Sequence, residues 1–179
     1  MPDFAIAPAT LADAAQVAAI YAHHVWHGTA TFEIVPPGEA EIAARMANVL
    51  GSGWPWLVAR DENGEVLGFA YATQYRERAA YRHACENSVY LRDDQRGRGI
   101  GAALLAALIA AASACGFRQM IAGIARSEPA SIALHAKAGF SEVGRLRNVG
   151  RKHGQWLDVI YMQRSLGAGD SVPPAEELA

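Results

Sequence analysis

Hydrophobic residues recur at helical spacing in four segments of the chain. The first segment, residues 11–25, follows a capping sequence that begins at Thr10 with an acidic residue three positions later, and it ends before Gly28. The other three helices are predicted over residues 39–50, 99–115 and 129–138. Three of these four segments are followed directly by glycine, which commonly ends a helix, so their ends are well marked.

Short apolar runs fill the intervals between these helices and predict β-strands. The runs cover residues 4–8, 56–59, 66–71, 87–91, 120–124, 140–143 and 157–163. Asn63-Gly64 separates two of them and favours a hairpin. Residues 74–82 are polar and predict a loop or a short helix, and residues 149–154 predict a turn. Strands that precede and then alternate with helices predict a mixed α/β fold with one sheet.

The length and composition predict one folded domain. The chain has 179 residues, of which 51% are hydrophobic and 19% are charged. We expect the domain to span residues 1–166, and residues 167–179, rich in Gly, Pro and acid, to form a disordered tail.

Charge and cysteine content exclude several classes of function. A formal charge of −2 gives no bulk affinity for nucleic acid or an anionic membrane, although it leaves room for a local basic patch. The most apolar segment, residues 100–115, is shorter than the roughly 20 residues of a membrane span. Two cysteines cannot build a disulfide framework, and no secretory signal is evident, so we expect a cytoplasmic protein.

A glycine-rich turn before the third helix carries the clearest chemical signal. Free N–H groups at a helix start attract anions, glycines let the backbone approach a ligand, and arginines add charged contacts to phosphate. The segment fits neither the Walker loop nor the Rossmann fingerprint, yet it predicts a diphosphate site. The candidate residues are Gln95, Arg96, Gly97, Arg98, Gly99, Ile100, Gly101 and Ala102.

This turn resembles the pyrophosphate-binding signature of the GNAT superfamily of N-acetyltransferases. The preceding strand resembles the one that pairs with the pantetheine arm of coenzyme A, and residues 131–140 resemble the superfamily's last helix and its Gly-Phe strand. The resemblance implies the GNAT fold, a single mixed, mostly antiparallel sheet flanked by helices, with acetyl-CoA as co-substrate and no metal. It adds Val89, Tyr90, Leu91 and Ser131 to the cofactor-binding residues.

A narrower resemblance is carried by residues 53–59, 68–72, 86–90 and 152–158. These segments are similar to the phosphinothricin and methionine sulfoximine N-acetyltransferases. The likeness implies transfer of an acetyl group to the amine of a small amino-acid-like substrate, by direct attack through a tetrahedral intermediate. A homodimer is implied by this resemblance alone.

Two side chains are candidates for proton transfer. Glu86, placed just before the pantetheine-binding strand, resembles the glutamate that acts as base in these enzymes, directly or through water. His135 occupies the position where most of the superfamily has a tyrosine acid for the leaving thiolate, and histidine can serve as acid or base. Most glutamates and many histidines are merely solvated or structural, so the resemblance carries both assignments.

Substrate recognition calls for a group that binds a carboxylate. Arginine matches a carboxylate bidentately, so Arg76 and then Arg82 are the candidates, with Tyr75 and Tyr81 as pocket walls. Lys152 and Trp156 are weaker candidates.

One position departs from the family pattern. Glu128 stands where the superfamily usually has an asparagine that contacts coenzyme A, and a carboxylate there is expected to alter cofactor affinity. His23, His24 and His27 lie close together but lack a third ligand, so we interpret them as surface residues.

Two other functions stay open from the sequence. A protein N-terminal or polyamine acetyltransferase would share the same cofactor site, and an acidic cleft would favour polyamines. A non-catalytic acyl-CoA-binding module would need neither Glu86 nor His135.

Overall fold

The structure, a computed structural model, describes residues 3–174. Those residues form seven strands and four α-helices, joined by three short 3-10 turns. In chain order the elements are β1 (Ala5–Pro8), η1 (Leu11–Asp13), α1 (Ala14–His27), α2 (Glu39–Gly51), β2 (Trp56–Arg60), β3 (Val66–Gln74), η2 (Ala79–Tyr81), β4 (Ala84–Leu91), η3 (Asp93–Gln95), α3 (Ile100–Ala114), β5 (Gln119–Ala125), α4 (Pro129–Lys137), β6 (Ser141–Lys152) and β7 (Gln155–Ser165).

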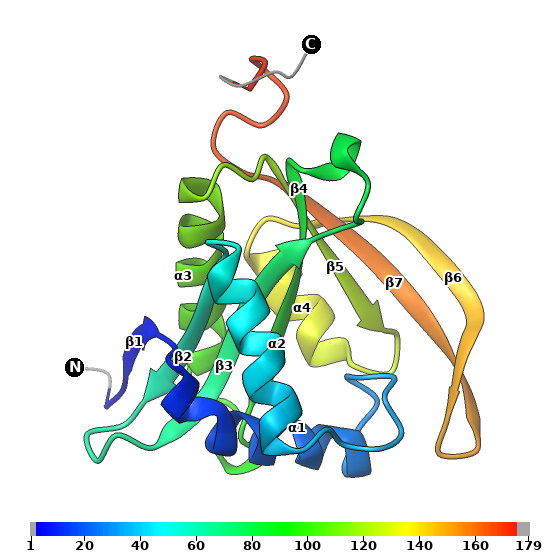
Figure 1. The fold of residues 1–179 in the computed structure, drawn as a ribbon. Helices are drawn as coiled ribbons and strands as arrows, with labels where there is room; N and C mark the ends of the chain where they lie inside the picture. The colour runs from blue at the N-terminus through cyan, green and yellow to red at the C-terminus, as the bar shows by residue number, and fades with distance from the viewer. Residues whose placement is uncertain (1–2, 175–179) are drawn as a thin grey trace.

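The predicted mixed α/β fold with a single, mostly antiparallel sheet is confirmed. The strand order is β1-β2-β3-β4-β5-β7-β6, and β4 with β5 is the parallel pair. Helices α1 and α2 pack on one face of the sheet and α3 on the other, as Figure 1 shows. Each face therefore has its own apolar core, one around Met46, Trp56 and Phe69 and the other around Leu104, Leu108 and Met120.

Two of the predicted boundaries are wrong in ways that matter. Strand β4 begins at Ala84, so Glu86 lies inside the strand instead of before it. Strand β6 runs to Lys152, whereas the sequence predicted a strand over 140–143 and a turn over 149–154. Two register irregularities along β6, whose residues are almost all exposed, hide the alternation that marks a strand. The tight turn is confined to His153 and Gly154, both with positive φ.

The sheet splits between its two central strands. Strand β4 pairs with β5 only from Ala84 to Glu86, yet it continues alongside β3 as far as Leu91. Strand β5 likewise continues alongside β7 to Ala125. The two strands therefore separate after Glu86, and the backbone groups of residues 87–90 have no strand neighbour on that side.

The segment predicted to be a disordered tail begins with a turn against the domain. Gly169 N–H donates to the Leu166 carbonyl oxygen (2.8 Å), and Leu166 N–H donates to Arg118 (2.9 Å). Residues 175–179 lie outside the described part of the chain. Within residues 3–174 no helix is both long and apolar enough to cross a bilayer.

Candidate active site

Two adjoining cavities occupy the split in the sheet. The smaller, about 60 Å³, lies between residues 87–90 of β4 and residues 122–125 of β5 and reaches His135 on α4. The larger, about 300 Å³, extends from Val89 and Leu91 to the glycine-rich turn. Both are lined by Ala30, Val89, Glu128 and Ser131, so the two cavities adjoin each other along the way from the turn to the separated strands.

The glycine-rich turn forms one end of the larger cavity. Gly97 and Gly99 have φ values of +77° and +80°, which side chains rarely adopt, and they lead directly into the first turn of α3. The first N–H groups of α3 have no partner within the helix and carry the positive end of its dipole. Together with Arg96, Gly101 and Ala102, which also line the cavity, these groups suit a diphosphate.

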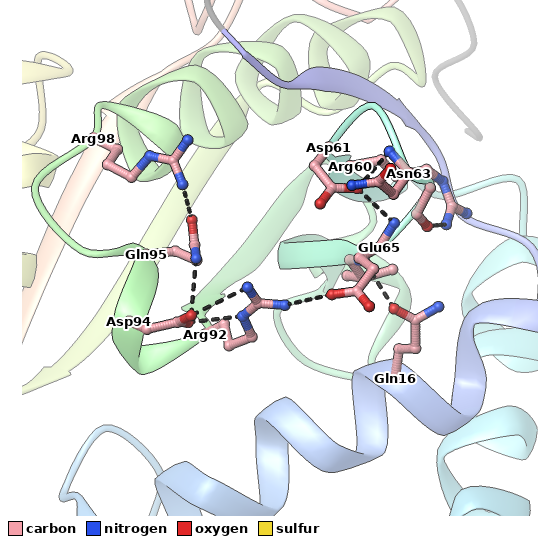
Figure 2. Close-up of polar contacts among 11 residues, drawn as sticks. Gln16, Arg60, Asp61, Asn63, Glu65, Arg92, Asp94, Gln95 and Arg98 are labelled. Atoms are coloured by element: carbon pink, nitrogen blue, oxygen red, sulfur yellow. Dashed lines mark hydrogen bonds and ion pairs between the residues drawn. The ribbon is translucent and has the colours of Figure 1, made fainter.

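The other predicted residues of the turn contact other residues of this protein or lie in its core. Arg98 donates to Gln95, which in turn donates to Asp94, and Asp94 is paired with Arg92 (Figure 2). Arg98 also pairs with Asp3. Ile100 is fully buried in the core beneath α3. The Tyr90 side chain packs edge-on against Tyr21, so only its backbone faces the open edge.

Glu86 lies where the strands begin to separate. Its Oε1 is 3.0 Å from the point that a β-carbon on Gly123 would occupy, and Tyr161 and Val159 of β7 border the same point. Burial raises the pKa of Glu86, and the positive charge of Arg76 lowers it by less, so the net shift is upward. A carboxyl with a raised pKa accepts a proton from an ammonium group more readily than an ordinary one.

Glu86 and His135 approach the split from opposite faces of the sheet. Successive residues of a strand point to alternate faces, and Tyr90 packs with α1 and α2 whereas Val89 and Leu91 pack with α3. Glu86 therefore shares the α1/α2 face with Tyr90, while Asn87, which contacts His135, shares the other. Two reactants bound on opposite faces of the sheet would therefore meet at the gap between β4 and β5.

His135 is 3% exposed and is held at both ring nitrogens. Nδ1 is 2.8 Å from the Ser131 carbonyl oxygen, and Nε2 is 3.0 Å from Asn87 Oδ1. Burial lowers the pKa of His135 because the charged imidazolium is poorly solvated there. The ring packs edge-on against Phe140, which fixes its plane.

The loop after β3 presents the predicted substrate residues to solvent beside Glu86. Arg76 lies over the Tyr75 ring at 4.7 Å, and Tyr81 meets Tyr75 edge-on at 5.8 Å between ring centres. The Arg82 guanidinium instead donates to the Ala79 carbonyl oxygen in its own loop (3.3 Å). The structure therefore groups Arg76 with the two tyrosines and leaves Arg82 apart.

A strap formed by residues 28–33 covers the cavities through Ala30. Thr29 donates to Glu128 Oε1 (2.7 Å), and Lys152 Nζ donates to the Thr31 carbonyl oxygen (2.7 Å). Lys152 is thus 4% exposed and fastens the strap instead of facing a substrate. Trp156 remains exposed, with Arg151 over its ring.

Three residues of the site were missed by the sequence analysis. Three residues surround the start of the split: Asn87, Gly123 and Tyr161. They lie on three different strands, and only the sheet topology brings them close to Glu86 and His135. His24 was interpreted as a surface residue, which is wrong: it is buried and bonded through Nε2 to the Leu91 carbonyl oxygen (2.8 Å). Among the described residues no cluster of three His, Cys, Asp or Glu could hold a metal.

The chain matches known acetyltransferases over nearly its whole length. Residues 6–161 match the family described as Acetyltransferase (GNAT) domain. The sequence is 50% identical over 163 residues to phosphinothricin N-acetyltransferase of Alcaligenes faecalis, covering 90% of this chain and 82% of that one. It is 42% identical over 168 residues to the L-methionine sulfoximine/L-methionine sulfone acetyltransferase of Pseudomonas aeruginosa, covering 94% and 98%.

Structural comparison agrees with the sequence matches. The crystal structure of a GNAT superfamily phosphinothricin acetyltransferase from Sinorhizobium meliloti, in complex with AcCoA, superposes with a TM-score of 0.95. The two chains are 46% identical, and the superposition covers 97% of this chain and 94% of that one.

The split sheet and the glycine turn at a helix start are those of an acyl-CoA-dependent transferase, and the chain belongs to the GNAT family of acetyltransferases. GNAT enzymes use acetyl-CoA as co-substrate, and the open edge of β4 and the cavity at the turn fit it. The resemblance to the phosphinothricin and methionine sulfoximine group is also confirmed.

Proposed function

We propose that this protein acetylates the amine of a small amino-acid-like substrate of the phosphinothricin, methionine sulfoximine or methionine sulfone type. The observation that carries the proposal is the placement of Glu86, half-buried at the split, beside Arg76 and on the sheet face opposite His135. Relatives named for these substrates match 82% or more of their own length to this chain, which supports the same substrate class.

Each residue has a distinct task in this proposal. Arg76 binds the substrate carboxylate, and Tyr75 and Tyr81 wall the side-chain pocket. Glu86 takes the proton from the substrate ammonium, directly or through water, so that the neutral amine can attack. The unpaired backbone of residues 87–90 and the glycine turn orient the co-substrate, which supplies an activated thioester carbonyl.

His135 gives a proton to the departing thiolate in the same proposal. It reaches the smaller cavity from α4, on the side where the thiol end of the co-substrate would lie. Ser131 and Val89 line both cavities.

The experiment follows free thiol released from acetyl-CoA in the presence of methionine sulfoximine, phosphinothricin, a polyamine and a peptide amine. Release with the two amino acids is expected, and Glu86→Gln should lower kcat by about 100-fold or more. Glu62→Gln, in an exposed turn, is the matched control and should act like the native protein.

Two other outcomes would replace this function. Turnover confined to the polyamine or the peptide amine would assign the protein to one of those classes. Binding of coenzyme A without thiol release from any amine would identify an acyl-CoA-binding module.

The proposal includes a homodimer and a cytoplasmic location. Strand β6 ends the sheet and carries exposed apolar side chains at Val143, Leu146 and Val149, each 45–59% exposed. An apolar edge of this kind is commonly covered by another chain, here a second copy. Light scattering should give the mass of two chains; a monomer mass at micromolar concentration would reject the dimer.

Cys85 and Cys115 are both free thiols, which supports the proposed location in a reducing compartment, the cytoplasm.

A further inference from the structure

His135 lies between two hydrogen-bond acceptors. The Ser131 carbonyl oxygen is 2.8 Å from Nδ1, and Asn87 Oδ1 is 3.0 Å from Nε2. A carbonyl oxygen has no proton to donate, so each contact is favourable only when the ring nitrogen carries the proton. A neutral imidazole has one such proton and can satisfy only one of the two oxygens.

The amide of Asn87 is fixed in the orientation that presents its oxygen. Asn87 Nδ2 donates to the Ile121 carbonyl oxygen (3.1 Å), the last β5 residue that pairs with β4. Turning the amide over would offer Nδ2 to the ring but would place Oδ1 against the Ile121 oxygen. Asn87 is 7% exposed, so an unsatisfied oxygen there is costly.

Within residues 3–174, no other side chain that lines the smaller cavity changes this balance at the two ring nitrogens. Phe140 covers the ring edge-on at 5.0 Å between ring centres. The titratable side chains that line the same cavity are Glu128, already an acceptor for Thr29, and Tyr90, which faces Tyr21. The ring is therefore satisfied at both nitrogens only in its doubly protonated form.

We propose that Asn87 is a positioning residue that keeps a proton on His135 Nε2 and so makes His135 the acid of the reaction, not its base. The inference rests on the proposed function. In the step concerned, the Nε2–H bond breaks as an S–H bond forms on the thiolate of coenzyme A. The electron pair left on Nε2 then faces Asn87 Oδ1, an unfavourable contact that is relieved when water returns a proton.

Burial and the acceptor pair act on His135 in opposite directions. Burial lowers its pKa, whereas a second acceptor raises it by stabilising the charged form. Removing the acceptor at Asn87 should therefore lower the pKa of His135, and a carboxylate in its place should raise it.

The test compares Asn87→Leu with Asn87→Asp. Both variants lose the donor to Ile121, and they differ in whether an acceptor faces Nε2. Asn87→Asp also places a carboxylate oxygen against the Ile121 carbonyl oxygen, so it should be the less stable of the two. Thermal melts check that each is folded. The nitrogen-15 shifts of His135 are then followed against pH in the protein saturated with coenzyme A. His24, bonded to the Leu91 carbonyl oxygen, serves as an internal control.

We expect the His135 midpoint to move to lower pH in Asn87→Leu and to higher pH in Asn87→Asp, with His24 unchanged. In turnover assays the alkaline limb of kcat should follow the same two directions. At a pH above its native midpoint, Asn87→Leu should lower kcat by about tenfold or more, with little change in the KM for acetyl-CoA.

Equal midpoints in the three proteins, or a shift in the same direction in both variants, would overturn the inference. If only one variant folds, its direction relative to the native protein decides. If no amine is acetylated, the proposed function fails, while the titration of His135 still reports whether Asn87 controls its proton.

Discussion

Gly123 makes room for the Glu86 carboxylate, and filling that room should impair catalysis without unfolding the protein. A β-carbon at residue 123 would lie 3.0 Å from Glu86 Oε1, 3.5 Å from Tyr161 Cε1 and 3.8 Å from Val159. The last two distances are ordinary contacts, so the carboxylate must give way by a few tenths of an ångström. Because a misplacement of about 1 Å can cost 100-fold in rate, we expect Gly123→Ala to lower kcat by roughly 3- to 10-fold.

Stability should change little in the same variant. Alanine in place of a strand glycine reduces the freedom of the unfolded chain and stabilises by about 0.5–1 kcal/mol, which offsets the crowding. The matched control is Gly144→Ala on β6, which pairs with Tyr161 of β7 from the other side and where an added β-carbon meets no atom within 4 Å. Its kcat and melting temperature should stay close to native.

Thiol release gives kcat and KM for each variant, and a double variant tests the cause. When Glu86→Gln has already removed the base, Gly123→Ala should have little further effect on the rate, because the two changes act through one group. A native kcat in Gly123→Ala, or an equal loss in the native and Glu86→Gln backgrounds, would refute the argument that Gly123 positions the carboxylate.

Two further predictions follow from the charges and the strap. The rate should fall at acid pH as Glu86 becomes protonated. Because Arg76 lowers the pKa of Glu86, Arg76→Gln should move the acid limb of kcat/KM to higher pH. An acid limb that stays in place in a pH series would contradict this. A β-carbon on Gly150 would overlap the Phe32 ring, which is 41% exposed and free to turn aside, so Gly150→Ala should reduce stability by less than about 1 kcal/mol in denaturant titration, and by nothing further in a Phe32→Ala background.

The pattern of apolar residues predicts most of the fold because it depends on local spacing. The four helices finish within two residues of their predicted C-terminal ends, since Gly28, Gly116 and Gly139 mark three of those ends. The course of β6 could not be predicted, because two irregularities shift its register and most of its side chains face solvent. The apolar residues of β6, Val143, Leu146 and Val149, are spaced three apart and exposed, so they show no period-two alternation that would mark a strand.

In the site, as in the fold, local features could be predicted from the sequence and long-range contacts could not. The glycine turn is visible because its conformation needs glycine at positions 97 and 99, and because a helix begins directly after it. Arg98 shows the limit of that reasoning: its assignment as a phosphate contact stays a prediction, and in the structure it pairs with Asp3, 95 residues away in the sequence. Nothing local specifies that contact.

Asn87 shows why the remaining site residues escape a sequence analysis even though they lie beside predicted ones. Its position next to Glu86 gave no reason to prefer it over Ser88, because the side chains of a strand differ in role only by the face they point to. The face was decided by β5, which pairs with β4 up to Ile121 and then turns away, leaving a carbonyl oxygen that the Asn87 amide satisfies. The same amide then presents its oxygen to His135 from the other end. The split that opens the cavity therefore also orients the group that controls the proton on His135, and both follow from where one short parallel pairing ends.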